Sequence, residues 1–277
     1  DAAAVSDANL RTALRELMEG DAFHGFLISG ANDRLLTDAF SSGLPFDLAD
    51  DNYPFFADLA QKRYDFFETN GEGNETSNQW WEEFFNSFYW GMVRSPLELI
   101  AYVVENDKPY TEILTADYMM LNSQMSEVFR SGLSFSDDSK NNFKPGKHNG
   151  QIVQDDQFSG DFVQNIGHYV DSHSGFIENY PHAGVLNTHA YLNRYPTTET
   201  NRNRARSRWT NYHFLGVDIE KSAARTTDPE ALADTNNPTL NNPSCTVCHT
   251  IMDPVAGAFA NYGDEGWFNQ YRQPTFF

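Results

Sequence analysis

The sequence has few cysteines, few basic residues and no long apolar run, and each shortage excludes a class of protein. Only two of its 277 residues are cysteines, so the chain is not a small disulfide-rich scaffold. Its 19 lysines and arginines face 39 acidic residues, which gives a net charge of −20. This acidity argues against nucleic acid and anionic lipid as partners. No run of 18 apolar residues occurs, so we expect no membrane span.

The chain does contain enough apolar residues to build a folded core. Hydrophobic residues make up 40% of it and aromatic residues 14%, which is typical of a globular protein and not of a disordered one. A length of 277 residues is enough for one large domain or two small ones.

Both cysteines lie in one short stretch, residues 244–254. Cys245 and Cys248 are separated by two residues, and His249 follows at once. C-x-x-C-H is the attachment signature of a c-type haem, in which the two thiols add to the two vinyl groups of the haem. The histidine then offers its imidazole to the iron. We therefore predict one covalent haem c, with Cys245 and Cys248 as thioether anchors and His249 as the axial ligand.

The same cysteine spacing occurs in two other kinds of site. One is a redox disulfide, but no strand-then-helix pattern leads into this pair, as it does in thioredoxin-like proteins. The other is half of a zinc site, which histidines would have to complete because the chain has no second cysteine pair.

The first 130 residues show apolar side chains at helical spacing, broken by glycine and proline. This predicts a mainly α fold in which residues 1–130 form a helical support region. The aromatic residues along it are interpreted as core. The predicted helices cover residues 7–19, 32–40, 53–69, 79–94, 97–104 and 110–129, with a break at Ser95 and Pro96.

Residues 131–180 lose this periodicity and are rich in Gly, Asn, Ser and Asp. They are interpreted as an irregular insertion, in which residues 150–153 and 162–169 form short strands or turns. The acidic pairs at 137–138 and 155–156 could hold calcium, although they lack the spacing of an EF-hand loop. Residues 181–277 would form the haem-binding module, and we expect all three regions to make one compact unit.

Four arginines stand close together at positions 202, 204, 206 and 208 of this acidic chain. A haem carries two propionates, and arginine is the side chain best suited to pair with carboxylates. Arg206 and Arg208 are the candidates for this role. The alternative is a helix whose arginines pair with the protein's own acidic residues.

Three stretches together resemble the planctomycete-type cytochromes, a family of exported bacterial proteins that end in a C-x-x-C-H haem site. Residues 114–122 are similar to its "LTADY-x-x-LN" signature, and residues 183–216 to its "AGLLT…RG-x-W…LLG" segment. Residues 245–254 are similar to its "C-x-x-CH-x-x-[IM]-DP" segment. The sequence departs from the family's pattern at two places. Gly257 comes one residue later than the family's glycine, and the family's later signature survives only as residues 261–264. The resemblance implies a c-type haem in a mainly α exported protein, and little about a substrate.

The axial position opposite His249 needs a second ligand or stays open. Met252 lies one helical turn past His249 and would pack against the haem edge on the same side. His189 belongs to a segment that, by the resemblance, folds near the haem, so it is the predicted distal ligand. The alternatives are an empty sixth position or one of the residues His182, His213, His168 and Met125.

These observations favour a monohaem c-type cytochrome that carries electrons over one that catalyses a reaction. Its partner would be a redox protein or neighbouring copies of itself, in a homo-oligomer or filament. The alternatives are a peroxidase-like or oxidase-like haem enzyme with an open distal site, and a filament-forming structural cytochrome. Covalent haem attachment takes place outside the cytoplasm, and Asp1-Ala-Ala-Ala looks like a processed start. We therefore expect a periplasmic or extracellular protein whose leader has been removed.

Overall fold

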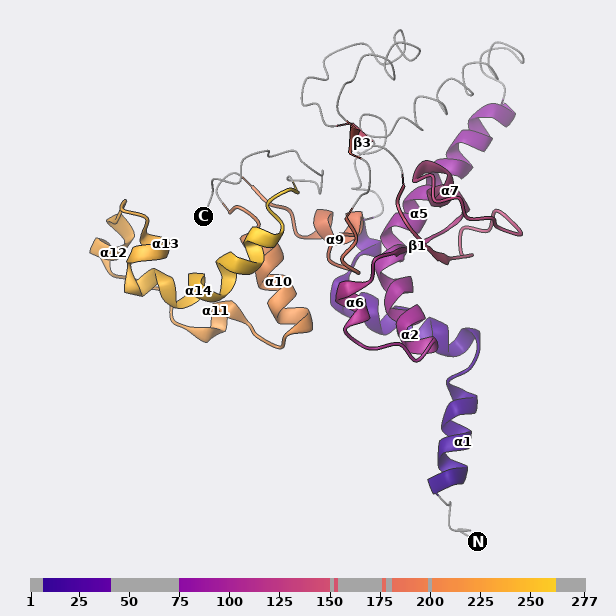
Figure 1. Cartoon of the computed structure of the whole chain (residues 1–277), viewed down its shortest axis with the longest axis horizontal. Helices are drawn as coiled ribbons and strands as arrows, with labels where there is room; N and C mark the ends of the chain where they lie inside the picture. The colour runs from indigo at the N-terminus through magenta and orange to yellow at the C-terminus, as the bar shows by residue number, and fades with distance from the viewer. Residues whose placement is uncertain are drawn as a thin grey trace.

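The computed structural model describes residues 7–40, 75–149, 152–153, 176–177, 181–198 and 201–262. The protein is mainly helical, as predicted, with four short strands in this part of the chain (Figure 1). The predicted helix over 53–69 and the segment 162–169 lie outside the described residues. The first elements are α1 (Asp7–Leu17), α2 (Asp21–Leu35), η1 (Asp38–Phe40), α5 (Glu75–Glu105), α6 (Glu112–Thr115), β1 (Met119–Leu121) and α7 (Ser123–Val128). The others are β2 (Lys144–Gly146), β3 (Ile152–Val153), β4 (Phe176–Ile177), α9 (His189–Arg194), α10 (Arg204–Phe214), α11 (Ile219–Ser222), α12 (Pro229–Ala233), α13 (Pro238–Asn241) and α14 (Pro243–Ala258).

Helix α5 forms the centre of the first half of the molecule. Its apolar residues recur at helical spacing and are buried, and α2, β1, α7 and α9 pack against it. Burial of such side chains contributes roughly 1.5–3 kcal/mol each, so this helix carries much of the hydrophobic stabilisation of the fold. Among the side chains of α5 that the structure describes, the buried apolar ones include Phe84, Phe88, Met92, Val93, Leu97, Leu99, Ala101 and Val103.

Pro96 does not end a helix, so the break predicted at Ser95 and Pro96 is wrong. α5 runs through it without interruption. A proline inside a helix removes one backbone hydrogen bond and costs about 3 kcal/mol. Val93 and Leu97, on either side, are fully buried in the core. Their packing offsets the loss, which the local sequence pattern does not reveal.

The single helix predicted over residues 110–129 is also wrong, because the chain there forms α6, β1 and α7. Asn122 divides the segment, since its side chain accepts a hydrogen bond from the Met125 amide at 3.0 Å and so caps the start of α7. The same side chain donates to the Ser87 carbonyl of α5 at 2.7 Å. All three residues of β1 are buried, and β1 pairs antiparallel with β2. A strand buried on both faces leaves no alternation to distinguish it from a helix.

Two further strands lie in the region predicted to be irregular. β3 falls within residues 150–153, one of the segments predicted as strand or turn, and it pairs antiparallel with β4. Each of these strands has two residues.

Residues 183–185 attach the second half of the chain to the first. The Gly184 amide donates to the Ala116 carbonyl at 3.0 Å, and the Val185 amide donates to the Ile113 carbonyl at 2.8 Å. Gly184 has a φ of 55°, and a Cβ there would lie 2.0 Å from the Ile113 oxygen. Only glycine allows this close approach of two backbones. α9, which follows, packs on α5, so the predicted haem-binding module begins with a segment bound to the helical region.

Helices α10 to α14 form a second group, with α10, α11 and α13 packed on α14. Figure 1 shows α9 between this group and α5. Arg206 of α10 ties the parts together, because its guanidinium donates to the carbonyls of Leu192 in α9 and Tyr262 after α14, each at 3.0 Å. Among the described helices, none is both long and apolar enough to cross a membrane.

Candidate functional site

The C-x-x-C-H motif occupies the first turns of α14. Pro243 opens the helix, where its missing N–H is not needed, and the Asn242 side chain accepts a hydrogen bond from the Ser244 amide at 3.0 Å. The local sequence therefore starts the helix two residues before Cys245. The two cysteines are not joined in a disulfide.

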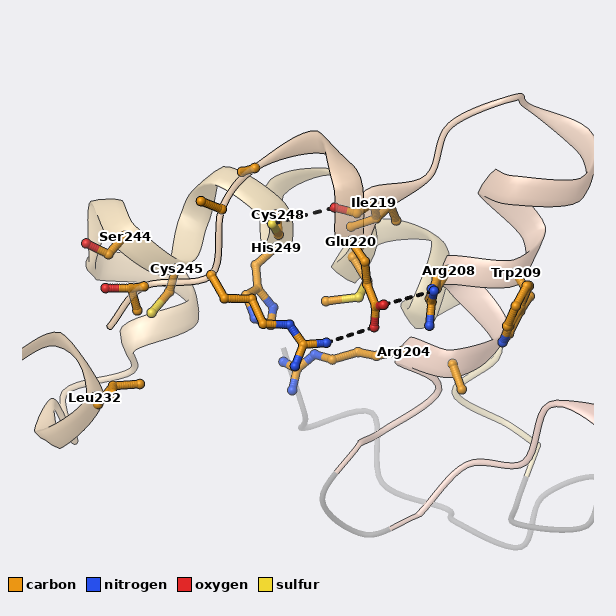
Figure 2. A pocket seen from close by; sticks show the side chains of 16 residues that line it. Arg204, Arg208, Trp209, Ile219, Glu220, Leu232, Ser244, Cys245, Cys248 and His249 are labelled. Atoms are coloured by element: carbon orange, nitrogen blue, oxygen red, sulfur yellow. Dashed lines mark hydrogen bonds and ion pairs between the residues drawn. The ribbon is translucent and has the colours of Figure 1, made fainter. Parts of the chain in front are cut away.

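The helix brings four predicted site residues onto one face. Cys245, Cys248, His249 and Met252 follow one another at spacings of three, one and three residues, which is the pattern of one helical stripe. All four line one pocket of about 510 Å³ (Figure 2). This volume is within the roughly 300–1,000 Å³ of protein sites for small molecules and cofactors.

The other walls of the pocket come from α10, α11 and the chain after α11. The Cys248 thiol lies 3.9 Å from the Ile219 carbonyl oxygen, and Ser207 donates to the Met252 carbonyl at 2.7 Å. These contacts hold α11 and α10 against the motif. The remaining lining residues are Arg204, Ala205, Arg208, Trp209, Ile219, Glu220, Ala223, Ala224, Arg225, Thr226, Leu232 and Ser244.

His249 is held by a carboxylate one helical turn further on. Its Nδ1 lies 3.0 Å from both carboxylate oxygens of Asp253. Arg204 of α10 donates two hydrogen bonds to the same carboxylate, with Nε 2.9 Å from Oδ1 and Nη2 3.3 Å from Oδ2. Within the described chain, Nε2 of His249 has no hydrogen-bond partner, so it is the nitrogen available to a metal.

Asp253 is ionised because of these two partners. Burial alone raises the pKa of Asp253, but the hydrogen bonds from Arg204 and His249 outweigh burial and leave this pKa below its ordinary value. The carboxylate is thus a charged acceptor for the imidazole N–H.

Two arginines in the pocket share one acidic residue. Arg208 Nη2 lies 2.9 Å from Glu220 Oε2, and Arg225 Nη2 lies 2.9 Å from Glu220 Oε1. Figure 2 shows the Glu220 carboxylate beside Arg208. The Arg225 side chain is 82% exposed, so it can change partner. For Arg208, the alternative of pairing with one of the protein's own acidic residues is what the structure shows, and the residue also lines the pocket.

Arg206 does not line this pocket. Its guanidinium is fully buried and donates to Asn203 Oδ1 at 2.7 Å as well as to the two carbonyls described above. The structure therefore places Arg208, but not Arg206, beside the cysteines.

His189 does not line the pocket either. It is buried at the start of α9, with its ring centroid 5.9 Å from that of Phe129. Burial lowers the pKa of His189 to about 4, so its imidazole is neutral at physiological pH. Neutral imidazole is the form that binds metals.

Two more histidines lie near His189. The His148 ring stacks on Phe129 with a centroid distance of 4.1 Å, and the His148 amide donates to His182 Nε2 at 3.0 Å. Within the described part of the chain, no group of three or more His, Cys, Asp and Glu side chains is arranged to hold a metal ion. Asp155 and Asp156 lie outside that part.

Sequence reasoning missed Asp253, Glu220 and Arg225. Asp253 could have been found, because it lies four residues after His249 in a helix and this spacing puts the two side chains in contact. Glu220 and Arg225 carry no motif. Their place in the pocket depends on how α11 and the chain after it fold back on α14.

Comparisons of the chain with protein-family models, curated proteins and solved structures found no match. The family resemblance of its motifs therefore stays a prediction.

Proposed function

We propose that this protein is a monohaem c-type cytochrome that transfers electrons outside the cytoplasm, to a redox partner protein or to a neighbouring copy of itself. One observation carries the proposal. Two unpaired cysteines and a histidine in C-x-x-C-H order line one pocket from the same face of a helix. This is the set of side chains that covalent haem attachment needs.

The residues of the pocket fit the parts of a haem. Cys245 and Cys248 would form the thioethers, and Nε2 of His249 would bind the iron. Met252, on the same face, would pack against the ring. Arg208 and Arg225 already hold a carboxylate, that of Glu220, and a haem propionate is the same chemical group. A bound haem would supply a one-electron couple whose potential depends on the ligands and on burial.

The first prediction concerns the covalent bonds. In protein produced with a haem-attachment system, haem should stay with the polypeptide through acid-acetone extraction. Replacing both Cys245 and Cys248 by Ala should make all bound haem extractable, because no other thiol exists in the chain. The measurement is the haemochrome spectrum of the extracted protein.

Ser244→Ala is the matched control, because Ser244 lines the same pocket but has no thiol. It should keep covalent haem at the wild-type level. Covalent haem in the double-alanine variant, or none in the wild type, would contradict the proposed function.

The second prediction concerns the distal ligand. We assign the sixth position to His189 from its place in the sequence, although in the structure it lies beside Phe129 and outside the pocket. If His189 binds the iron, His189→Ala converts a low-spin haem to a high-spin one, while His182→Ala leaves the spectrum as in the wild type. The optical spectra of oxidised and reduced protein make this measurement.

An unchanged spectrum in His189→Ala would remove this assignment and leave the anchors unaffected. A wild-type haem that is already high-spin would favour the haem-enzyme alternative. Electron microscopy of the purified protein tests the filament alternative.

A further inference from the structure

Asp253 is placed to act on the iron through His249. The two residues are one helical turn apart on α14, and both carboxylate oxygens lie 3.0 Å from Nδ1. The Asp253 side chain is only 14% exposed and that of His249 18%. Water therefore screens this contact little, and the charge on Asp253 acts at short range.

A charged acceptor for the Nδ1 proton changes how strongly the imidazole donates electrons to a metal through Nε2. A ligating histidine that donates its other N–H to a carboxylate has a fixed ring orientation and a higher basicity toward the metal. A carboxylate pulls this proton harder than a neutral acceptor does, since charge-assisted hydrogen bonds are about twice as strong. The imidazole thus gains part of the character of an imidazolate.

Arg204 limits this effect. It holds the same carboxylate with two hydrogen bonds, of 2.9 and 3.3 Å, and comes from a different helix. These two hydrogen bonds fix the orientation of the carboxylate, and the guanidinium neutralises part of its charge. His249, Asp253 and Arg204 therefore form a chain of hydrogen bonds that links α14 to α10.

We propose that Asp253 is a positioning residue that orients His249, increases its electron donation and lowers the reduction potential of the haem, with Arg204 moderating the effect. This inference rests on the proposed function, because it requires His249 to be the iron ligand. Reduction adds one electron to the iron and takes one positive charge from it. An anionic hydrogen-bond partner on the ligand therefore favours the oxidised state.

Asp253→Asn tests the proposal in the intact haem protein. The amide keeps a hydrogen-bond acceptor of similar size but removes the charge. The matched control is Glu220→Gln, which removes the same charge from another carboxylate in the same pocket without touching His249. The measurements are a potentiometric titration and the electron paramagnetic resonance (EPR) spectrum of the ferric haem.

We expect Asp253→Asn to raise the potential beyond any rise in Glu220→Gln. Mutation of such outer-shell partners changes metal affinity or activity by roughly 10–100-fold. We expect the excess to lie at the lower end of that scale, on the order of tenfold in the equilibrium constant for reduction, which is about 59 mV for one electron. The EPR g-values should change in Asp253→Asn and stay as in the wild type in Glu220→Gln. Equal potentials in the two variants, with unchanged g-values in both, would overturn the inference and leave the haem assignment standing.

Arg204→Gln provides a second test if Asp253→Asn does not fold. It frees the carboxylate to pull harder on Nδ1, so the g-values should shift in the direction opposite to that in Asp253→Asn, and the potential should fall. Lys221→Gln is its control, because it removes a cation of α11 that pairs with Asp218, does not line the pocket and does not hold Asp253, so it should leave the g-values alone. Wild-type g-values in Arg204→Gln would overturn the inference. A wild-type protein without covalent haem would overturn both proposals, which the haem assay detects before any potential is measured.

Discussion

At the scale of single residues, two arginines that are two positions apart in the sequence have opposite environments. Arg206 is fully buried, and its hydrogen bonds join α9, α10 and the chain after α14. Arg208 lines the pocket with a partly exposed side chain and pairs with Glu220. Because successive helical residues point about 100° apart, a shift of two positions moves the side chain from the pocket to the core.

The third prediction separates these roles with a pair of matched substitutions. Arg206→Met should lower the free energy of unfolding by on the order of 3 kcal/mol, because buried carbonyls lose their donor. Arg208→Met should lower it by less than about 1 kcal/mol, as expected for a partly exposed ion pair. Denaturant unfolding measures both.

If Arg208 holds a propionate, Arg208→Met should also lower the reduction potential, since a cation near the haem favours the reduced state. A larger loss of stability in Arg208→Met than in Arg206→Met would contradict the assignment of the two roles.

At the scale of elements, the approach of α7 to α5 depends on a glycine. A Cβ on Gly91 of α5 would lie 2.6 Å from Asn122 Nδ2 and 2.6 Å from Met125 Sδ. Asn122 cannot move away easily, since it caps α7 and also donates to Ser87. The glycine therefore makes room for the turn between β1 and α7.

The fourth prediction follows from this contact. Gly91→Ala should lower the free energy of unfolding by about 1–3 kcal/mol, because the added methyl group overpacks a filled core. Gly30→Ala is the control, since a Cβ at this position of α2 meets nothing within 4 Å. It should raise stability by up to about 1 kcal/mol through helix propensity. Urea unfolding measures the midpoints of both variants, which are compared where the dependence of the unfolding free energy on urea concentration is equal. An unchanged midpoint in Gly91→Ala would contradict the close approach.

At the scale of the whole molecule, the fold buries histidines in their neutral form. The pKa of His182 falls to about 4, because burial and the nearby Lys147 lower it more than Asp117 raises it. Burial likewise lowers the pKa values of His148 and His189. His182 must be neutral at Nε2 to accept the His148 amide, so its protonation breaks a hydrogen bond of the fold.

The fifth prediction is a loss of stability in mild acid. An unfolded histidine takes up its proton near pH 6.5, whereas folded His182 does so only near pH 4. Between these values the unfolded state binds more protons, so the free energy of unfolding should fall as the pH drops from 6.5 to 4. His182→Gln, whose amide oxygen can accept the same hydrogen bond, should show a shallower fall. Urea unfolding at several pH values measures the slopes, and equal slopes would contradict the role of His182.

Patterns among neighbouring residues determined the fold class and part of the candidate site by themselves. Helical periodicity predicts a mainly α fold and the start of α1, because the spacing of apolar residues is a property of neighbouring positions. The C-x-x-C-H motif brings Cys245, Cys248, His249 and Met252 together, since all four lie within two turns of one helix. The same reasoning covers Asp253, four residues after His249.

Only the tertiary structure decided what depends on contacts between distant segments. Pro96 stays inside α5 because the surrounding core outweighs its lost hydrogen bond, and β1 forms because β2 lies beside it. Arg206 and Arg208 look alike in the sequence, but the packing of α9 and α14 on α10 sends one to the core and the other to the pocket. Arg204, Glu220 and Arg225 reach the pocket by the same folding of one helix on another. Such positions are fixed by the burial of side chains far apart in the chain, which no local pattern records.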